Sequence, residues 1–471
     1  MKINIKFKRF ISAVMCAVTV GLVFTSCSAG GKVPELPEKT LPYTSDKKQL
    51  GDGNLKNSVK LSKGEYADID FGGEVTFDTV ALYEKGDNCN EFNIYIEKNG
   101  EWELVYKQDR ILKYHLCFIG EVTASKLRFE IADCKNPVEV KELAVYLADK
   151  TDRQVKVSQY LRLDVNDFEN LKDDEGFTGY YDVVTDPILF GETYMDENAN
   201  ICFNHSEEFF AQQINALKEI IGDRNVRIWC CIFFDQKGGD GSSDYNLTKK
   251  FINENIDLIK SNIKAFSEKY GIYGIDYDWE YPTTLSQWKS YDKIIEETAK
   301  VTKVSVAVAP WGVKFSRSAI NAIENVNIMA YDLFDDRGDH SNSYIAGYDA
   351  ISKVRSFGFK DEQLLLGIPT YARTTDKSEF AWPTVRDDGK ELGKWGKLVK
   401  DYPYTDTNTG EEKTCDAYLN SYAEARDKTA TSIDEGIGGI MIFRAFCDSP
   451  YTDEFSIHRG IKEAVDERSS K

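Results

Sequence analysis

Three carboxylates alternate with apolar residues within residues 271–282, which read Gly-Ile-Tyr-Gly-Ile-Asp-Tyr-Asp-Trp-Glu-Tyr-Pro. Because successive side chains of a β-strand point to opposite faces, Asp276, Asp278 and Glu280 share one face. Like charges at this spacing disfavour full ionisation and raise at least one pKa, and such costly clusters are typical of catalytic sites. The alternative is an exposed edge strand with solvated acids, but the opposite face is too apolar for that. We therefore predict a catalytic group of acids.

Eight strand-like apolar runs can position these acids, and helical periodicity lies between most of them. The predicted strands are residues 155–163, 187–194, 226–234, 272–280, 304–309, 326–332, 364–371 and 438–444. The clearest helical runs are residues 209–221, 247–270, 288–301 and 343–357. This order predicts an α/β fold, a (β/α)8 TIM barrel over residues 151–471, with the acids at the carboxyl end of its fourth strand. The alternative is an open doubly wound sheet, but no glycine-rich phosphate loop opens any helix.

The chain also contains a long connection after the seventh strand. Residues 374–414 are too many for a plain turn, so we expect an insertion beside the cleft.

Before the barrel, short alternating runs separated by turn residues predict an all-β sandwich domain over residues 45–150. Asn99-Gly100 between two such runs is a strong hairpin signal. Residues 92–102 and 142–146 resemble the discoidin-like (coagulation factor type C) fold, which is often a carbohydrate-binding module. A spacer without a ligand is the alternative. Residues 27–44 are rich in Gly, Pro, Ser and Lys and are expected to form a flexible tether.

The amino terminus has the pattern of an export signal. Residues 1–27 carry basic but no acidic side chains, and the apolar run 11–24 is too short to span a bilayer of about 30 Å. The run ends Phe-Thr-Ser-Cys27, which resembles a bacterial lipobox with Phe24 in place of the usual Leu. This resemblance implies a signal peptide over residues 1–26, lipidation of Cys27 and an anchor on the extracellular face of the bacterial cell envelope. Plain secretion is the alternative.

The composition limits the partners that the chain can have. Its formal net charge is −19 over 471 residues, and this acidic balance argues against a nucleic-acid partner. A membrane is expected to contact the protein only through the lipid anchor. The ten cysteines include no Cys-x-x-Cys pair and the four histidines show no metal-ligand spacing, so no metal or other cofactor is predicted.

The carboxylate run resembles the signature of glycoside hydrolase family 18, the chitinase family. That signature is Asp-x-x-Asp-x-Asp-x-Glu, and the present chain matches it as Tyr273-x-x-Asp276-x-Asp278-x-Glu280. Tyr273 stands in place of the first Asp, which in the family supports the other acids. The departure therefore concerns the proton-sharing network and leaves the acid Glu280 in place.

Three later strands extend the resemblance in the family's order. They supply Met329-x-Tyr331-Asp332, a Gly-x-Pro-x-Tyr371-x-Arg373 segment, and a last strand that ends with Phe443 where chitinases usually have Trp. A Phe at this position still stacks on a sugar, but with less area and no indole donor. The resemblance covers about residues 155–468.

The resemblance implies substrate-assisted, retaining hydrolysis of N-acetylglucosamine glycans. Glu280 would protonate the glycosidic oxygen, and the substrate's own acetamido oxygen would attack the anomeric carbon. Asp278 would accept the N–H of the resulting oxazolinium, and Asp276 would share a proton with Asp278. Tyr331 would donate to the acetamido oxygen, and Asp332 would assist around the same group.

Other candidate substrate-binding residues have a competing structural interpretation. Met329 could pack the wall, Trp311 could cap a helix, Tyr160 could face the core and Arg373 could form a salt bridge. The full set of candidate binding residues is Asp332, Met329, Phe443, Trp311, Tyr371, Arg373 and Tyr160.

Three functions fit the resemblance. The first is hydrolysis of the β-1,4 bonds of chitin or chito-oligosaccharides, and the second is an endo-β-N-acetylglucosaminidase activity on the chitobiose core of N-glycans. The third is a lectin that binds chitin without cutting it; the intact Glu280 argues against this last function.

Overall fold

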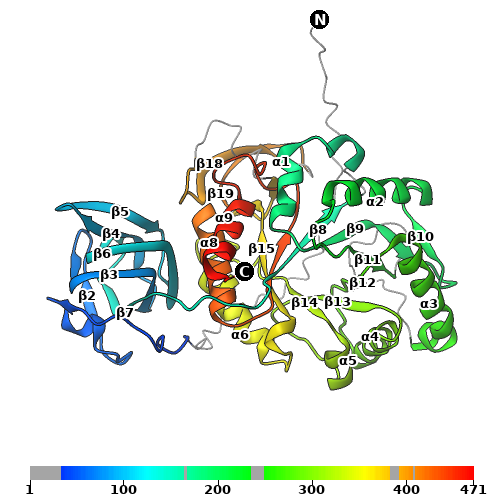
Figure 1. Ribbon diagram of the computed structural model, residues 1–471, viewed down its shortest axis with the longest axis horizontal. Coiled ribbons are helices and arrows are strands. Elements are labelled where there is room, and N and C mark those ends of the chain that lie inside the picture. Colours follow the sequence, from blue (N-terminus) through cyan, green and yellow to red (C-terminus); the bar gives the residue numbers. More distant parts are fainter. Residues whose placement is uncertain (1–32, 164–166, 235–248, 382–391, 407–408, 471) are drawn as a thin grey trace, which may run out of the picture.

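The computed structural model describes residues 33–163, 167–234, 249–381, 392–406 and 409–470 (Figure 1). The predicted signal segment and Cys27 lie outside these residues. Figure 1 shows an all-β body formed by the N-terminal residues, drawn in blue and cyan, beside a larger barrel with its surrounding helices. Across the described residues, no helix is both long enough and apolar enough to cross a membrane.

Eight parallel strands close into the barrel, because β8 pairs with both β9 and β20. In chain order they are β8 (Lys156–Arg162), β9 (Asp186–Met195), β11 (Trp229–Phe233), β12 (Gly274–Tyr277), β13 (Lys303–Val308), β14 (Asn325–Ile328), β15 (Leu364–Pro369) and β20 (Gly439–Phe443). A ninth strand, β10 (Ile201–Phe203), pairs antiparallel with β9. The predicted (β/α)8 barrel is therefore confirmed, and the eight predicted strands all appear.

Helices cover the outside of this barrel. They are α1 (Glu175–Thr178), α2 (Glu207–Ile221), α3 (Lys249–Tyr270), α4 (Leu285–Thr298), α5 (Arg317–Ala322), a π-helical turn (Tyr344–Asp349), α6 (Ala350–Arg355), α8 (Tyr422–Asp434) and α9 (Ile457–Arg468). Side chains cap several helices, and α4 has a full capping box in which Thr284 and Gln287 satisfy each other's backbone N–H groups. Within the described residues of the barrel, short turns of 3-10 helix occur at Phe168–Leu171, Gly179–Asp182 and Asp361–Gln363, and another, Lys48–Gly51, belongs to the N-terminal body.

The alternation along the strands divides the barrel residues into two apolar groups. Ile275 and Tyr277 of β12 pack outward with the helices in the main core. Tyr160, Trp229 and Met441 point inward and belong to a smaller cluster that fills the barrel interior. The sequence prediction that the apolar face of the fourth strand meets the helices is therefore confirmed.

The N-terminal body is a seven-stranded antiparallel sheet folded around its own core. Its strands are β1 (Thr44–Ser45), β2 (Val59–Leu61), β3 (Tyr66–Lys85), β4 (Cys89–Lys98), β5 (Glu101–Gln108), β6 (Tyr114–Cys134) and β7 (Val138–Tyr146). The two long strands β3 and β6 pair with each other along most of their length, with register shifts that interrupt the ladder. This confirms the predicted all-β N-terminal domain, which we call the sandwich.

Residues 33–44 lie against the sandwich along the part of the predicted tether that the structure describes. The Leu41 N–H donates to the carbonyl of Val145 at 2.8 Å. The Tyr43 hydroxyl donates to the carbonyls of Leu50 and Leu143, both at 2.7 Å. The predicted limits of the tether, the sandwich and the barrel remain predictions.

The sandwich packs directly on the barrel through helix α8. Nearly every residue of α8 is buried, because one side contacts β15 and β20 of the barrel and another contacts β6 of the sandwich. Aromatic residues of the sandwich, including Tyr83, Tyr114 and Phe118, share an apolar cluster with Tyr344 and Tyr348 of the barrel. The carboxylate of Asp427 on α8 accepts the Tyr106 hydroxyl at 2.5 Å.

The long connection after β15 forms its own small antiparallel sheet. Its four strands are β16 (Tyr371–Thr374), β17 (Glu379–Ala381), β18 (Leu398–Thr405) and β19 (Glu412–Tyr418), in the spatial order β17-β16-β19-β18. This agrees with the insertion predicted after the seventh barrel strand.

Candidate active site

The three carboxylates lie at the carboxyl end of β12, as the alternation predicts. Asp276 is the last inward-facing residue of the strand and is fully buried, while Asp278 is 6% exposed. Glu280 follows in the loop and is only partly exposed. The acids therefore run from the barrel interior toward its mouth, which is where barrel enzymes hold their catalytic groups.

Asp276 is held by donors from three other strands. Its carboxylate accepts the Tyr160 hydroxyl of β8 at 2.9 Å, the Asn327 amide of β14 at 3.2 Å and the Ser305 hydroxyl of β13. Burial raises the pKa of Asp276, and these hydrogen bonds oppose that rise by favouring the carboxylate. Tyr160 thus faces the barrel interior and the acids, not the outer core.

Ser305 and Asn327 were not among the predicted site residues. Both are buried, and both point inward from strands whose other side is made of Val and Ile. A polar residue that alternates with outward Val and Ile residues of a buried strand is the signal that would have identified them.

Asp278 lies between the other two acids. Burial raises its pKa well above the ordinary value, and the neighbouring charges of Glu280 and Asp276 raise it further. The Asp278 carboxyl therefore retains a proton at a pH where an exposed aspartate has lost it. Since the acids interact, their titrations are linked, and the proton belongs to the group rather than to one residue.

Aromatic residues form the floor beside the acids. The rings of Tyr331 and Phe443 stack with centroids 5.4 Å apart and an angle of 18°, and Tyr371 meets both edge-on at 6.1 Å. Burial raises the pKa of the Tyr331 hydroxyl, and the nearby charges of Glu280 and Asp278 add to the rise. The hydroxyl is therefore kept as an O–H donor next to the carboxylates.

Asp332 and Arg373 form a two-point ion pair at the rim. The Arg373 Nε and Nη2 donate to the two carboxylate oxygens at 2.9 and 2.6 Å. Burial alone would raise the pKa of Asp332, but the neighbouring His340 ring and the hydrogen bonds from Arg373 hold that pKa below its ordinary value. The structure therefore places Arg373 in the salt bridge that was one of its two predicted roles.

Met329 and the segment around Trp311 occupy different parts of the wall. Met329 is buried against Ala307 and Ala309 and contacts the Tyr331 ring. Trp311 is 48% exposed and Tyr281 is 38% exposed, and their ring centroids are 6.1 Å apart.

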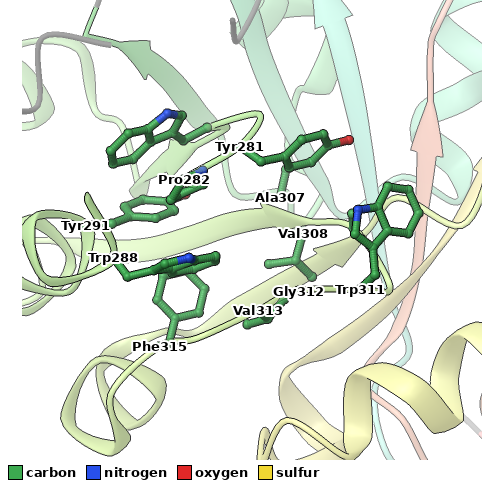
Figure 2. Close-up of a pocket in the computed structure, with 12 residues that line it drawn as sticks. Tyr281, Pro282, Trp288, Tyr291, Ala307, Val308, Trp311, Gly312, Val313 and Phe315 are labelled. Atoms are coloured by element: carbon green, nitrogen blue, oxygen red, sulfur yellow. The ribbon is translucent and has the colours of Figure 1, made fainter. Parts of the chain in front are cut away.

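These two exposed rings stand at an apolar pocket next to the acids (Figure 2). Figure 2 shows Tyr281 and Trp311 on one side of the pocket and Trp288, Tyr291 and Phe315 on the other. The pocket is lined by Trp279, Tyr281, Pro282, Trp288, Tyr291, Ala307, Val308, Ala309, Trp311, Gly312, Val313 and Phe315. Exposed aromatic faces beside a polar centre are suited to stacking on sugar rings.

Comparison with known sequences identifies the family of this barrel. The model of the family described as glycosyl hydrolases family 18 matches residues 186–448, more than half of the chain. The chain belongs to glycosyl hydrolases family 18. The matched residues run from β9 to the end of β20 and include all three acids. They do not include the sandwich, whose resemblance to the discoidin-like fold stays a prediction.

Known proteins of similar sequence and fold agree with this membership. The curated Nod factor hydrolase protein 1 of Medicago truncatula is 29% identical over 168 residues, which span 28% of this chain and 40% of that protein. A chitinase from Bacteroides thetaiotaomicron has a TM-score of 0.52 and 16% identity, covering 67% of this chain and 98% of its own. A class V chitinase from Nicotiana tobaccum, solved in complex with NAG4, has a TM-score of 0.50 and 15% identity, covering 66% and 99%. At these identities the two structures show the fold.

This member of family 18 departs from the family signature at Tyr273. The Tyr273 ring packs edge-on against Trp229 at 5.1 Å, and the Arg227 guanidinium lies 5.0 Å from the ring centre. Arg227 and the Trp229 indole both donate to buried Asp186 at 2.8 Å. An aromatic and ionic cluster therefore fills this position, and the groups that donate to Asp276 are neutral hydroxyl, amide and thiol groups.

Proposed function

We propose that this chain hydrolyses β-1,4 linkages of N-acetylglucosamine-containing glycans, such as chitin or chito-oligosaccharides, with retention of configuration. The observation that carries the proposal is the order of the acids. Asp276 is fixed as an acceptor in the barrel interior, Asp278 has a raised pKa, and Glu280 stands at the mouth next to the Tyr331 hydroxyl. Family membership supports a glycosidase.

In the first step, Glu280 acts as the general acid and protonates the glycosidic oxygen of the leaving sugar. The carbonyl oxygen of the substrate's own 2-acetamido group attacks the anomeric carbon, and the glycosidic bond breaks. The product of this step is a bicyclic oxazolinium, which carries a positive charge and an N–H. No enzyme carboxylate becomes covalently attached.

Asp278 and Tyr331 orient the acetamido group for this attack. Asp278 accepts the acetamido N–H and stabilises the positive charge that develops there. Tyr331 donates its hydroxyl hydrogen to the acetamido oxygen and holds that oxygen in line with the anomeric carbon. The stacked Phe443 ring provides the surface beneath the reacting sugar.

Asp276 supports Asp278 from inside the barrel. Neutral hydroxyl, amide and thiol groups hold the Asp276 carboxylate, so its negative charge keeps the shared proton on Asp278 in the free enzyme. When the acetamido group arrives, this proton passes to Asp276, and Asp278 becomes the carboxylate that accepts the N–H. In the second step, Glu280 acts as the base toward water, which opens the oxazolinium and restores the acid.

The mechanism limits the substrate class, because the sugar at the cleavage site must carry a 2-acetamido group. The NAG4 complex of the Nicotiana tobaccum chitinase supports an N-acetylglucosamine glycan as the ligand. Exposed Trp311 and Tyr281 supply stacking surfaces for further sugars beside the cleavage site. The Asp332–Arg373 ion pair lies at the rim of the site that we propose for the acetamido group. Met329 and Tyr371, which pack beside Tyr331, form the wall of that site.

A thiazoline analogue of the oxazolinium should inhibit the enzyme competitively. The thiazoline ring copies the bicyclic intermediate, so Asp278 and Tyr331 should bind it at least about 100-fold more tightly than diacetylchitobiose, which lacks the ring. Inhibition constants for both compounds on the same reporter substrate measure the difference. Equal inhibition constants with an active enzyme would argue for a mechanism without the acetamido group.

Product analysis on two substrates separates the competing functions. Chitin oligosaccharides and a high-mannose glycopeptide are incubated side by side, and the products are identified by mass spectrometry. Cleavage of the oligosaccharides supports the proposal, whereas cleavage of the glycopeptide alone identifies an endo-β-N-acetylglucosaminidase. Binding of chitotetraose without any product over a long incubation identifies a lectin.

We also propose that the protein is anchored by a lipid on Cys27 at the extracellular face of a bacterial envelope. The lipobox-like end of the signal segment supports this proposal. Cys27→Ser should release the protein from the membrane fraction into the medium or the soluble fraction, as an immunoblot of the fractions would show. If the variant stays in the membrane fraction as the wild type does, Cys27 is not the anchor.

A further inference from the structure

The loop that follows β14 carries Tyr331 and Asp332 and then runs along the sandwich. It turns back on itself, because the Leu333 N–H donates to the His340 carbonyl at 3.0 Å and the Asp335 N–H donates to the Asp339 carbonyl at 2.9 Å. We call residues 332–341 the rim loop. Its first residue, Asp332, holds Arg373, and its polar tip points away from the acids toward the neighbouring domain.

Arg110 of the sandwich makes a buried contact with the rim loop. Its guanidinium donates to Asp335 at 2.5 Å, and both side chains are only 3% exposed. The same guanidinium pairs with Asp87 of the sandwich and lies 3.0 Å from Asp336 of the loop. A buried charge of this kind is stable only while its partners stay in place.

Asp335 links the contact with Arg110 to the conformation of the rim loop. One of its carboxylate oxygens accepts the backbone N–H groups of Arg337 and Asp339, at 2.8 and 3.0 Å, while the other accepts Arg110. The carboxylate is thus the centre of the turn. Without Arg110, the buried Asp335 would lose the guanidinium that pairs with it, and burial and Asp339 both raise the pKa of Asp335.

Two further contacts tie the rim loop to the sandwich. Arg337 donates to the Cys89 carbonyl at 3.1 Å and to the Asn90 side chain at 2.7 Å. Asp339 is paired at 2.6 Å with buried Lys397 of the insertion, which lies 3.4 Å from Asp109 of the sandwich.

The other end of the rim loop reaches the candidate active site. His340 is fully buried, with its Nδ1 3.2 Å from Asp332 and its ring against Tyr371 at 5.3 Å. Asp332 itself has a positive φ of 56°, a conformation that a non-glycine residue keeps only where its surroundings hold it. A shift of the loop would therefore move Asp332 and the adjacent Tyr331.

We propose that Arg110 of the sandwich is a positioning residue for the active site, which acts by holding the rim loop through Asp335 so that Tyr331 and Asp332 keep their places. The effect on catalysis rests on the proposed function. The sandwich then helps to maintain the conformation of the active site and is not only a spacer or a separate binding module. The rim loop connects the sandwich to the site, because it contacts Arg110 at Asp335 and includes Asp332 next to Tyr331.

Arg110→Met tests the proposal, because it removes the charge and keeps the length of the side chain. We expect amide hydrogen exchange in residues 333–341 to rise at least about tenfold. We expect kcat on a chitin oligosaccharide to fall about tenfold, with KM changed less than about threefold, since the positioned groups act mainly in the transition state. Arg110→Lys should restore kcat to within about threefold of the wild type, because it returns the charge to Asp335.

Asp78→Asn is the matched control. Asp78 is a buried acid of the sandwich that pairs with Arg468 of the barrel, so its change weakens the same interface without touching the rim loop. It should leave loop exchange and kcat within about twofold of the wild type. Equal effects of Asp78→Asn and Arg110→Met would overturn the proposal, because they would indicate a general loosening of the two domains.

A folded Arg110→Met protein with unchanged loop exchange would also overturn it. If Arg110→Met does not fold, Asp335→Asn repeats the test, because it removes the charge that pairs with Arg110 while its amide oxygen can still accept the N–H groups of Arg337 and Asp339. A wild type that hydrolyses nothing would remove the proposed function, and the hydrogen-exchange comparison would still decide whether Arg110 holds the loop.

Discussion

Glu280→Gln should lower kcat by about 10³-fold while sugar binding stays measurable, because the amide cannot protonate the leaving oxygen. The substitution keeps the size of the side chain, so the cleft and the aromatic floor should be unchanged. Glu280 is partly exposed in the loop after β12, and the change should therefore have little effect on the buried hydrogen bonds of Asp276. Hydrolysis of a reporter chitin oligosaccharide gives kcat, and calorimetry gives the affinity for chitotetraose.

Glu219→Gln on helix α2 is a suitable control, because this glutamate is largely exposed on the outside of the barrel. It should have wild-type kcat and affinity. Full activity of Glu280→Gln would show that Glu280 is not the general acid. If the variant instead loses both its fold and its sugar binding, the fall in kcat reflects unfolding and not the loss of the acid.

Asp278→Asn should lower kcat by about 100-fold, because the amide no longer provides a negative charge for the oxazolinium N–H. It should also change the pH dependence. In the wild type, burial raises the pKa of Asp278 and the charges of Glu280 and Asp276 raise it further, so the acids lose their protons in linked steps. The neutral amide of this variant removes one acid from the group, so Glu280 should lose its proton at lower pH.

The alkaline limb of the pH–rate profile of Asp278→Asn should therefore move to lower pH than that of the wild type. The sign follows because Glu280 must be protonated to act as the acid, and a negative neighbour favours the protonated form. Profiles of kcat/KM for the wild type, Asp278→Asn and Tyr331→Phe measure the shift. Tyr331→Phe removes a donor but no acid, so it should lower the rate and leave the alkaline limb in place. An unmoved limb in Asp278→Asn would show that the two acids are not linked.

The sequence was sufficient to predict the barrel and the place of the acids within it. Strand side chains alternate with a period of two, so Asp276 and Asp278 could be assigned to the inside from their spacing alone. The order of the strand-like runs then placed these acids on the fourth of eight strands, and β12 has that position. Both inferences depend only on local pattern and on chain order.

The partners of those acids could not be predicted in the same way. Ser305 and Asn327 contact Asp276 because β13 and β14 follow β12 in the barrel, and their hydrogen bonds depend on the register between strands. The contact between Arg110 and Asp335 joins residues 225 positions apart in the chain. No local pattern of the sequence carries such a pairing, since the pairing is set by the way in which two domains pack.

The central claim is that the substrate's own acetamido group takes part in the reaction. Proton NMR of the products formed from chitotetraose and from its fully de-N-acetylated counterpart tests this claim most directly. We predict that the reducing end first released from chitotetraose is the β-anomer and that the de-N-acetylated tetramer is not cleaved. An α-anomer as the first product, or cleavage of both tetramers at similar rates, would contradict the account.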